Sequence, residues 1–438
     1  MATCLAPVPE RATVRVNAIR MKPPLVPPQP VSWIHVRCGR GYVPGTVFAT
    51  PSAGTLELMA SAHQIKVGGV PIGGGAPVVV QSMTLTKTHD VEATTAQIAA
   101  LASAGCEIAR VAVPKREDAQ ALPLIVRLSP IPVIADIHFN ASLALEAIDA
   151  GVHAVRINPG NIGGPDKTEQ VVKAAKRAGI PMRIGANAGS LPKHLEELAR
   201  TDTAEALVVE ALEQVAILER LDYRDFKISV KASHVPTMIR AYRMLSERVP
   251  YPLHLGVTEA GTPFAGAIKS AVGMGSLLMD GIGDTMRVSL TADPVKEVEV
   301  AWEILKSLGL RERGPVMIAC PSCGRDNVGV ESLAVVVEQR LRDYPEAFEV
   351  AVMGCAVNGP GEAGDADFGI AGGRDVGFVY AHGRVLKKVS SDVLIDELFN
   401  EIDRWIADGM PRPKRLKMAK PAALAMAEAS LIPLGSPQ

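Results

Sequence analysis

Three cysteines in the last third of this 438-residue chain carry its strongest chemical signal. Cys320 and Cys323 form a Cys-x-x-Cys pair, and Cys355 follows a second apolar run. A tight turn at this spacing directs both sulfurs of such a pair at one metal centre. Three thiolates leave a tetrahedral site or a cubane cluster one ligand short. Glu362 is a candidate for that position, because a glycine-proline loop, NGPGEA, folds it back toward the cysteines.

The type of metal can be weighed from the donor set. A structural zinc site normally has four protein ligands, often as two Cys or His pairs. Here the second half offers a single cysteine, and the nearest histidine, His382, lies far along the chain. Iron–sulfur clusters are held by thiolates, and an incomplete set leaves one iron open. The donors therefore favour an iron–sulfur cluster, with zinc as the alternative.

Composition limits the class of protein. The chain is 47% apolar and 21% charged, with a formal net charge of -1. It therefore has no general attraction to nucleic acid or to an anionic membrane, and its apolar runs stay below the ~18 residues of a membrane span. Unevenly spaced cysteines do not form a secreted disulfide framework. We expect a globular protein of two or three domains in the cytoplasm.

Residues 1–64 differ from the rest of the chain. They are rich in proline and arginine, poor in acidic residues, and show no helical or strand period, so we expect disorder. No apolar stretch typical of a secretory signal peptide is present. A transit peptide, a dispensable extension, or a true start at Met59 are the alternatives. Cys4 and Cys38 fall in this segment and are given no role.

Residues 65–308 alternate β-branched runs with helical stretches. The eight runs lie at residues 78–83, 108–114, 132–138, 153–161, 182–190, 226–233, 253–261 and 284–294. Asp90 and Asn140 are expected N-caps, and Gly179 is expected to end a helix. Eight such units are typical of a closed, parallel TIM-like (β/α)8 barrel. An open doubly wound sheet would also alternate, but count and length favour the barrel.

Polar side chains stand at the ends of these strand runs. In a barrel the carboxyl ends of the strands meet at one mouth, where catalytic residues gather. Five cations are predicted to converge there: Arg110, Arg156, Arg183, Lys231 and Arg287. Such a set fits a ligand with two phosphates. The plainer alternative is that these cations pair with Asp136, Glu259 or Asp284.

A smaller α+β domain is predicted after the barrel. Residues 309–314 (GLRERG) are expected to form a linker, residues 315–406 the domain, and residues 407–438 a tail. Within the domain we expect a strand ending at Cys320, a helix over 331–342, a strand at FEVAVMG and a helix over 392–406. A hairpin is expected to turn at His382 and Gly383.

Several motifs together resemble one known family. They are VQSMT at 80–84, ADIHF at 135–139, RINPGNIG at 156–163, KASHV at 231–235, LGVTEAG at 255–261, GIGDTMRVSLTADP at 281–294, ACPSCGR at 319–325 and GCAVNGPGEA at 354–363. In this order they closely resemble the bacterial (E)-4-hydroxy-3-methylbut-2-enyl diphosphate synthases of the non-mevalonate isoprenoid pathway. The resemblance covers residues 65–406. It implies a TIM-like barrel that binds substrate, followed by a domain similar to the 4Fe-4S part of sulfite and nitrite reductases.

The resemblance also implies an activity and roles for residues. The reaction would be reductive ring opening and dehydroxylation of 2-C-methyl-D-erythritol 2,4-cyclodiphosphate, with two electrons delivered through one 4Fe-4S cluster from a flavodoxin or ferredoxin. Cys320, Cys323 and Cys355 would bind iron, and Glu362 would be the displaceable fourth ligand. Glu259 would manage protons near the reacting carbons. The implied substrate contacts are Arg110, Arg156, Asn158, Arg183, Lys231, Thr258, Arg287 and Ser289.

The family resemblance also concerns the oligomeric state, and the sequence differs from the family at two neighbouring positions. The resemblance implies a head-to-tail homodimer. Leu85 and Lys87 stand where the family often has Asn and Arg, which puts a bidentate phosphate contact at position 87 in question. The competing functions are a non-enzymatic metal-binding barrel protein and another enzyme on a pterin-binding type of barrel.

Overall fold

The computed structural model describes residues 61–411, except 138–139, 161, 327, 356–358 and 374–375. Residues 1–60 and 412–438 therefore lie outside the described part, and with them Cys4, Cys38 and most of the predicted N-terminal extension and tail. His138, which belongs to the ADIHF motif, is also outside it.

Eight parallel strands form a closed barrel, as the sequence predicts. They are β3 (Val79–Met83), β4 (Ile108–Ala112), β5 (Val133–Asp136), β6 (Ala154–Arg156), β7 (Met182–Asn187), β8 (Phe226–Lys231), β9 (His254–Leu255) and β10 (Thr285–Met286). Their order in the sheet is β8-β7-β6-β5-β4-β3-β10-β9, and a parallel bridge between Ile228 and Leu253 closes the ring. The TIM-like fold class is thus confirmed.

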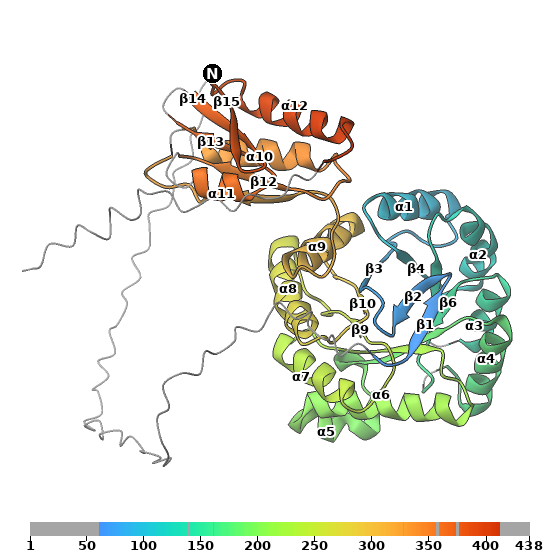
Figure 1. Ribbon diagram of the computed structural model, residues 1–438. Coiled ribbons are helices and arrows are strands. Elements are labelled where there is room, and N and C mark those ends of the chain that lie inside the picture. Colours follow the sequence, from blue (N-terminus) through green and yellow to red (C-terminus); the bar gives the residue numbers. More distant parts are fainter. Residues whose placement is uncertain are drawn as a thin grey trace, which may run out of the picture. The chain divides into compact units, whose positions relative to one another are not determined.

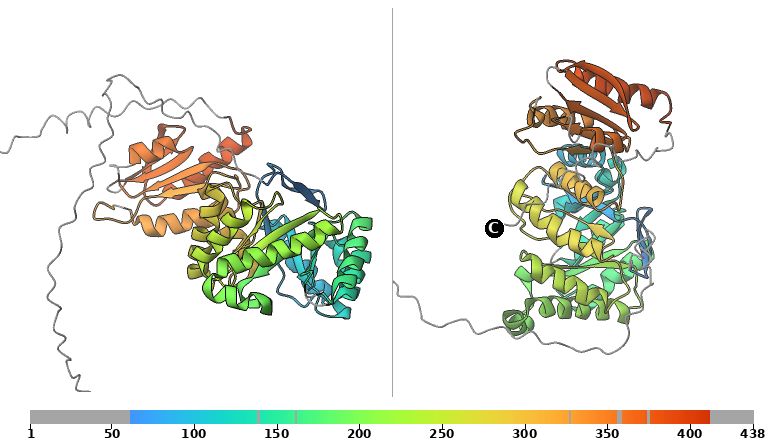
Figure 2. Two further views of the ribbon diagram at one scale, coloured as in Figure 1. Left: turned by 90° about the horizontal axis from the view of Figure 1, so that it is seen from below. Right: turned by 60° about the vertical axis from the view of Figure 1, so that its left-hand side comes forward.

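Helices surround the strands on the outside (Figures 1 and 2). They are α1 (Val91–Ser103), α2 (Arg116–Leu128), α3 (Ala141–Asp149), α4 (Pro165–Ala178), α5 (Glu196–Thr201), α6 (Thr203–Arg220), α7 (Val235–Ser246), α8 (Pro263–Met279) and α9 (Pro294–Ser307), with 3-10 turns at Ala188–Ser190 and Lys193–Leu195. Asp90 and Asn140 accept N–H groups at the starts of α1 and α3, and Gly179 ends α4 in the left-handed region. These three terminal signals were predicted correctly.

Inward-facing side chains change character along the barrel axis. Alternate residues of a strand point to the same side, and on β4 the interior receives Ile108 and then Arg110, while on β5 it receives Ile134 and then Asp136. The amino ends of these strands therefore line an apolar floor, and the carboxyl ends line a charged mouth.

A hairpin that the sequence did not predict closes the floor. Strands β1 (Gln64–Val67) and β2 (Val70–Gly73) pair antiparallel and lie across one end of the barrel (Figure 1). Ile65, Val67 and Ile72 pack against Val79, Ile108, Ile134 and Ala154 in one buried cluster. Because this cluster sits at the amino ends of the strands, the opposite end remains for ligands.

Part of the predicted linker packs on the barrel. The Arg311 guanidinium donates to the carbonyl of Val78 at 2.9 Å and to Glu107 at 2.8 Å, and it lies 4.6 Å from the ring centre of Trp302. The indole N–H of Trp302 donates to the carbonyl of Gly105 at 3.0 Å. These contacts fix the segment that follows α9 to the barrel wall.

The second domain is a five-stranded sheet with three helices. Its strands are β11 (Val316–Ala319), β12 (Glu349–Met353), β13 (Phe368–Gly372), β14 (Val376–Ala381) and β15 (Arg384–Ser390), and its helices are α10 (Val330–Leu341), α11 (Gly359–Asp365) and α12 (Leu394–Ala407). The first three strands are parallel and the last three antiparallel. The expected hairpin turns at His382 and Gly383, both with positive φ. Strand β13 was missed.

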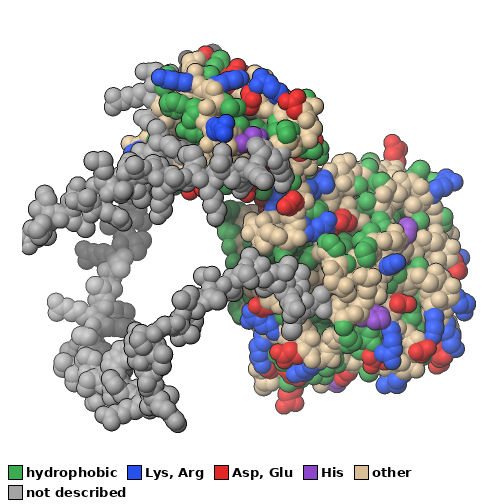
Figure 3. Space-filling view, in the orientation of Figure 1, with side chains coloured by type: hydrophobic (Ala, Val, Ile, Leu, Met, Phe, Trp, Pro, Cys, Tyr) green, Lys and Arg blue, Asp and Glu red, His purple; other side chains and the backbone are tan. Residues whose placement is uncertain are grey.

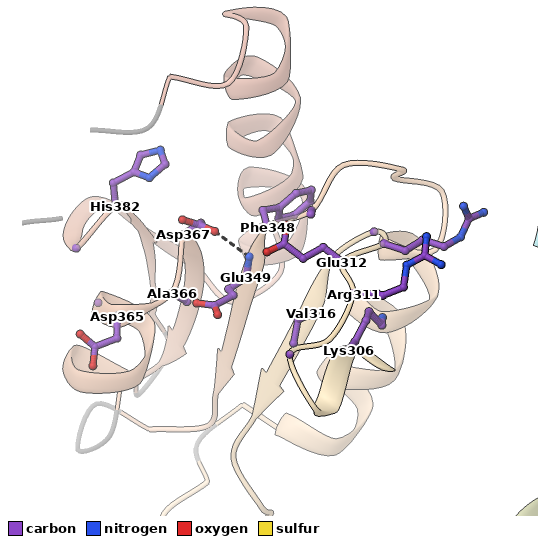
Figure 4. A pocket seen from close by; sticks show the side chains of 16 residues that line it. Lys306, Arg311, Glu312, Val316, Phe348, Glu349, Asp365, Ala366, Asp367 and His382 are labelled. Atoms are coloured by element: carbon purple, nitrogen blue, oxygen red, sulfur yellow. Dashed lines mark hydrogen bonds between the residues drawn. The ribbon is translucent and has the colours of Figure 1, made fainter. Parts of the chain in front are cut away.

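The two faces of this sheet are covered differently. One core cluster joins α10 and α12 to the sheet, and a second, smaller cluster contains Ala363 of α11, Met353 and Tyr380. Asp367 ties β12 to the start of β13, since its carboxylate accepts the backbone N–H of Glu349 at 3.0 Å (Figure 4). The pocket drawn there contains none of the predicted site residues.

Candidate active site

Two of the predicted cations share one carboxylate in the barrel mouth. Asp136, at the end of β5, lies 3.6 Å from Nε of Arg110 and 3.3 Å from NH1 of Arg156. All three side chains are more than nine-tenths buried. Burial lowers the pKa of Arg110 to about 10, against the opposing effect of Asp136. The pairing with Asp136 expected as the plainer alternative is therefore real for these two arginines.

Arg183 and Lys231 have no carboxylate partner among the described residues. NH2 of Arg183 donates to Ser229 Oγ at 2.7 Å, while its buried Nε makes no hydrogen bond there. Burial, together with the neighbouring arginines, lowers the pKa of both side chains well below their usual values. Gly256 on the neighbouring wall makes room for Lys231, because a Cβ at that position would lie 2.6 Å from Nζ. An anion in the mouth would oppose this lowering for Lys231, because an opposite charge favours the protonated lysine.

Arg287 is held by a carboxylate that belongs to a helix. Glu297, in the first turn of α9, accepts from Nε and NH2 of Arg287 at 3.3 Å. The same carboxylate accepts the hydroxyl of Ser82 at 3.0 Å and the backbone N–H of Leu290 at 2.9 Å. Glu259 and Asp284, the other expected partners, form no ion pair with the five cations in the described chain.

The Met83 thioether joins two of these arginines. Its sulfur accepts from Nε and NH2 of Arg110 at 3.2 and 3.0 Å and lies 3.9 Å from NH1 of Arg287. A thioether is a weak, uncharged acceptor. Met83 therefore orients the guanidinium groups without neutralising them, and a phosphate can replace it as their partner.

The remaining predicted substrate residues follow the same strands. Asn158, Thr258 and Ser289 are half-buried and come directly after β6, β9 and β10. Glu259 is exposed and has a φ of 53°, which is uncommon for a residue other than glycine. Backbone strain of this kind is found preferentially at functional sites. Lys87 and Leu85 are exposed in the loop after β3.

The barrel interior below the mouth holds further polar groups. Lys227 is fully buried and donates to Oε1 of Gln81 at 3.2 Å. His254 is also buried, and a hydrogen bond of 2.7 Å joins its Nδ1 to Thr285 Oγ1. Burial lowers the pKa of Lys227 and of His254 well below their usual values. His234 lies elsewhere, before α7, where it contacts Thr237.

Positive charge gathers inside the barrel rather than on the visible outer face. Figure 3 shows basic and acidic side chains interspersed over that face. In the mouth, by contrast, the five cations meet two carboxylates, Asp136 and Glu297. Among the described residues, the buried cations of the mouth outnumber the carboxylates that pair with them, which is the charge balance expected of a candidate anion site. No helix in the described chain is long and apolar enough to cross a membrane.

The cysteines lie at the carboxyl ends of two paired strands. β11 pairs with β12 in parallel, so that Cys320 and Cys355 follow neighbouring strand ends. The sulfur of Cys320 accepts the backbone N–H of Gly354 at 3.1 Å. Cys323 is exposed, and hydrogen bonds from the backbone and side chain of Arg325 lower the pKa of its thiol. A lowered pKa favours the thiolate, which is the form that binds metal.

The donor set fits an iron–sulfur cluster in chemistry, although the described side chains do not form a closed metal site. No three His, Cys, Asp or Glu side chains within the described ranges converge on one point. Glu362 is exposed on α11 and is separated from Cys355 by the undescribed residues 356–358. Soft thiolates and an N–H group directed at a sulfur are features of cluster sites. Cys106 is buried in the barrel.

Three polar residues near the site were missed from the sequence. Glu297, Glu210 and Gln214 lie on helices, are almost fully buried, and reach residues of the barrel wall or mouth. A signal was present for Glu210 and Gln214, because in α6 they fall on the same helical face as Leu207, Ala211 and Leu218. A polar pair on an apolar face indicates a specific role.

Two domains of one protein family match most of the chain. The GcpE TIM-barrel domain matches residues 62–302, and the GcpE protein C-terminal domain matches residues 316–404. A 4-hydroxy-3-methylbut-2-en-1-yl diphosphate synthase (flavodoxin) of Maridesulfovibrio salexigens is 55% identical over 347 residues, which is 79% of this chain and 97% of the relative. A protein of the same name from Geobacter sulfurreducens is 54% identical over 351 residues, covering 80% and 99%.

Solved structures match part of the chain at low identity and low TM-score. The dihydropteroate synthase of Yersinia pestis has a TM-score of 0.41 and 15% identity, and covers 56% of this chain and 98% of that protein. The 3-dehydroquinate dehydratase of Geobacillus kaustophilus has a TM-score of 0.41 and 13% identity over the same shares.

Proposed function

This chain belongs to the GcpE family, and we propose that it opens and dehydroxylates 2-C-methyl-D-erythritol 2,4-cyclodiphosphate to (E)-4-hydroxy-3-methylbut-2-enyl diphosphate. It is an oxidoreductase of the non-mevalonate isoprenoid pathway, as its curated relatives are. Those relatives are named for flavodoxin, and flavodoxin is accordingly the expected electron donor. Neither a non-enzymatic barrel protein nor a pterin-type barrel enzyme is favoured over this function.

The observation that carries the proposal is the excess of buried cations in the barrel mouth. Arg110, Arg156, Arg183 and Lys231 are each more than nine-tenths buried, and Arg287 stands beside them. Such a set is costly in an apolar barrel unless a polyanion neutralises it. A cyclic diphosphate supplies that charge, and the arginine forks suit its phosphoryl oxygens.

The chain's own residues would act on the substrate as follows. The five cations bind and orient the diphosphate, and they stabilise the negative charge that grows on it when the ring opens. Asn158, Thr258 and Ser289 offer neutral hydrogen bonds at the same mouth. We assign proton handling at the reacting carbons to Glu259, whose positive φ presents it from the loop after β9.

We further propose that the redox cofactor of this family is here one 4Fe-4S cluster. Cys320, Cys323 and Cys355 would hold it, with Glu362 as the displaceable fourth ligand. Support comes from the thiols at the ends of β11 and β12 and from the N–H group that Gly354 directs at Cys320. When bound, the cluster supplies electrons one at a time.

Anaerobic purification tests this function. We expect iron and acid-labile sulfide in a ratio of one, visible absorption, and consumption of the cyclodiphosphate with a chemical reductant. Cys355→Ser should lose the absorption and the activity, whereas the control Cys106→Ala should keep both because Cys106 is buried in the barrel. A colourless protein that carries zinc would overturn the cluster, and full turnover by Cys355→Ser would overturn its role.

We also propose a head-to-tail homodimer in the cytoplasm. Helix α8 offers an apolar contact, because Phe264, Ile268 and Val272 lie on one face and are 80%, 49% and 55% exposed. Each Å2 of such apolar surface that is removed from water stabilises the dimer by about 25 cal/mol. Sedimentation should give twice the chain mass for the wild type and the chain mass for Val272→Glu. A wild-type monomer at micromolar concentration would contradict the dimer.

A further inference from the structure

Helix α6 carries two polar residues on the face that packs against the barrel wall. Glu210 and Gln214 lie four residues apart among alanine, leucine and valine, and each is 3% exposed. A buried carboxyl or amide group without hydrogen-bond partners destabilises the folded protein by about 1–3 kcal/mol, as judged from mutational data. Side chains retained at such a cost have a structural or functional task.

The hydrogen bonds of this pair lead into the predicted substrate site. Gln214 accepts the backbone N–H of Gly185 at 3.0 Å and donates to Oε1 of Glu210 at 3.1 Å. The same Oε1 accepts from Nδ2 of Asn158 at 3.4 Å. Gly185 belongs to β7 and Asn158 follows β6, so the pair connects α6 with two strand ends of the mouth.

The orientation of the Asn158 amide follows from these bonds. Its Oδ1 accepts the backbone N–H of Gly160 at 3.0 Å, and its Nδ2 donates one hydrogen to Glu210. An amide nitrogen carries two hydrogens. The second hydrogen has no acceptor among the described residues and is available to an anion, and Glu210 determines where it points.

The two oxygens of Glu210 are in different surroundings. Both donors reach Oε1, whereas Oε2 is buried and has no hydrogen-bond partner in the described chain. An ionised carboxylate oxygen left without donors is strongly disfavoured in a buried place. Protonation at Oε2 removes that charge at the smaller cost of one unpaired neutral hydroxyl and leaves the carbonyl Oε1 to accept both bonds. This arrangement fits the carboxylic acid better than the carboxylate.

We propose that Glu210 is a positioning residue of the diphosphate site, which acts through Asn158 as an uncharged carboxylic acid. The inference rests on the proposed function, because it takes a diphosphate as the ligand of the mouth. A carboxylate behind Asn158 would repel that ligand, whereas the acid holds the same amide without adding negative charge. Binding of the anion near neutral pH is then accompanied by uptake of a proton at Glu210.

The local charges agree with this role. Burial raises the pKa of Glu210 to about 7, against the hydrogen bonds from Asn158 and Gln214 that lower it. Of the charged groups around it, Glu213 on the same helix raises the pKa and His194 lowers it. Arg156 of β6 and Arg183 of β7 are turned to Asp136 and Ser229 inside the barrel. A diphosphate beyond Asn158 would raise the pKa further.

Calorimetry with inorganic diphosphate as the probe tests the proposal on the full-length protein. Glu210→Gln copies the shape and neutrality of the acid. We expect it to bind diphosphate as tightly as the wild type at pH 6. At pH 8.5 it should bind about eightfold more tightly than the wild type if the ligand raises the pKa of Glu210 by one unit. Because the probe's own titration is common to both proteins, the ratio of their affinities isolates residue 210.

Three further measurements sharpen the test. In buffers of different ionisation enthalpy, the wild type at pH 7.5 should take up more protons on binding than Glu210→Gln. Glu210→Ala frees the Asn158 amide and should bind about tenfold more weakly than Glu210→Gln at every pH, the equivalent of one oriented hydrogen bond to a charged group. The control Glu213→Gln removes the neighbouring exposed charge, which pairs with His194, and should stay within twofold of the wild type.

The outcomes separate this inference from the proposed function. Equal diphosphate affinities and equal proton uptake in the wild type and Glu210→Gln across pH 6–8.5 would overturn the inference, even with normal turnover of the cyclodiphosphate. Absence of turnover in the cluster-loaded wild type would instead overturn the proposed function, while dependence of diphosphate binding on residue 210 would still support the positioning role. Circular dichroism of each variant identifies a loss of fold.

Discussion

Replacing Glu297 with alanine should destabilise the barrel by about 4 kcal/mol. Removing one member of a buried ion pair costs about 3–5 kcal/mol, and the Arg287 side chain is 15% exposed, which places this pair near the lower end. The hydroxyl of Ser82 and the N–H of Leu290 lose their acceptor as well. Each such loss costs about 1 kcal/mol where water does not replace it.

Urea unfolding followed by circular dichroism measures this effect. Glu299→Ala is the matched control, since it lies one half-turn along the same helix and pairs with Lys296 in an exposed position. We expect that control to change the free energy of unfolding by less than about 0.5 kcal/mol.

A double variant tests the cause of the loss. If the destabilisation comes mainly from the unpaired Arg287 guanidinium, the double variant Glu297→Leu/Arg287→Met should be about 2 kcal/mol more stable than Glu297→Leu alone. A loss below about 1 kcal/mol for Glu297→Ala would refute the reasoning. A double variant no more stable than Glu297→Leu would refute the assignment to the arginine.

Two more predictions concern the cations of the barrel. Burial lowers the folded-state pKa of Lys227, so the unfolded chain binds more protons between that pKa and about 10.5, and stability rises with pH in this window. Between pH 6 and 10, the unfolding free energy of the wild type should therefore rise relative to that of Lys227→Met by up to about 1.4 kcal/mol per pH unit. A difference between the two proteins that stays constant with pH would contradict this. Gly256→Ala places a Cβ 2.6 Å from Nζ of Lys231 and 3.0 Å from the carbonyl oxygen of Arg287; it should cost about 1 kcal/mol in stability and weaken inorganic diphosphate about tenfold in calorimetry, and an unchanged affinity would show that Lys231 does not contact the ligand.

The barrel was predictable because its signals are local and repeated. The parallel strands lie within short, largely apolar runs, and the caps at Asp90, Asn140 and Gly179 depend on a few neighbouring residues. The hairpin β1–β2 was missed because its strands have only four residues each and gain their stability from the barrel floor. Strand β13, FGIAG, was missed for a similar reason, since its small residues give no alternation.

The candidate site was predictable as far as strand order places residues. The carboxyl ends of eight parallel strands converge, which brought the arginines and Lys231 to one mouth without knowledge of any contact. Which carboxylate meets which cation could not be read from the sequence. Asp136 serves two arginines, whereas Arg287 meets Glu297 from a helix outside the barrel. Lys227 had a signal, because it alternates with Ser229 and Lys231 along β8 and so points inward with them.

The charges of the mouth bear on the direction of the proposed reaction. A cyclic diphosphate carries one negative charge on each phosphorus, and opening the ring at one carbon frees a terminal phosphoryl oxygen that adds negative charge. The five cations are opposed by Asp136 and Glu297, and Lys231 has its pKa lowered in the absence of an anion. Negative charge that develops on the opening ring gains attraction to these cations that the closed ring lacks, which favours the transition state over the bound substrate. On this argument an uncharged acid at Glu210 is needed for the same reason, since a carboxylate there would oppose the charge that the arginines and Lys231 stabilise.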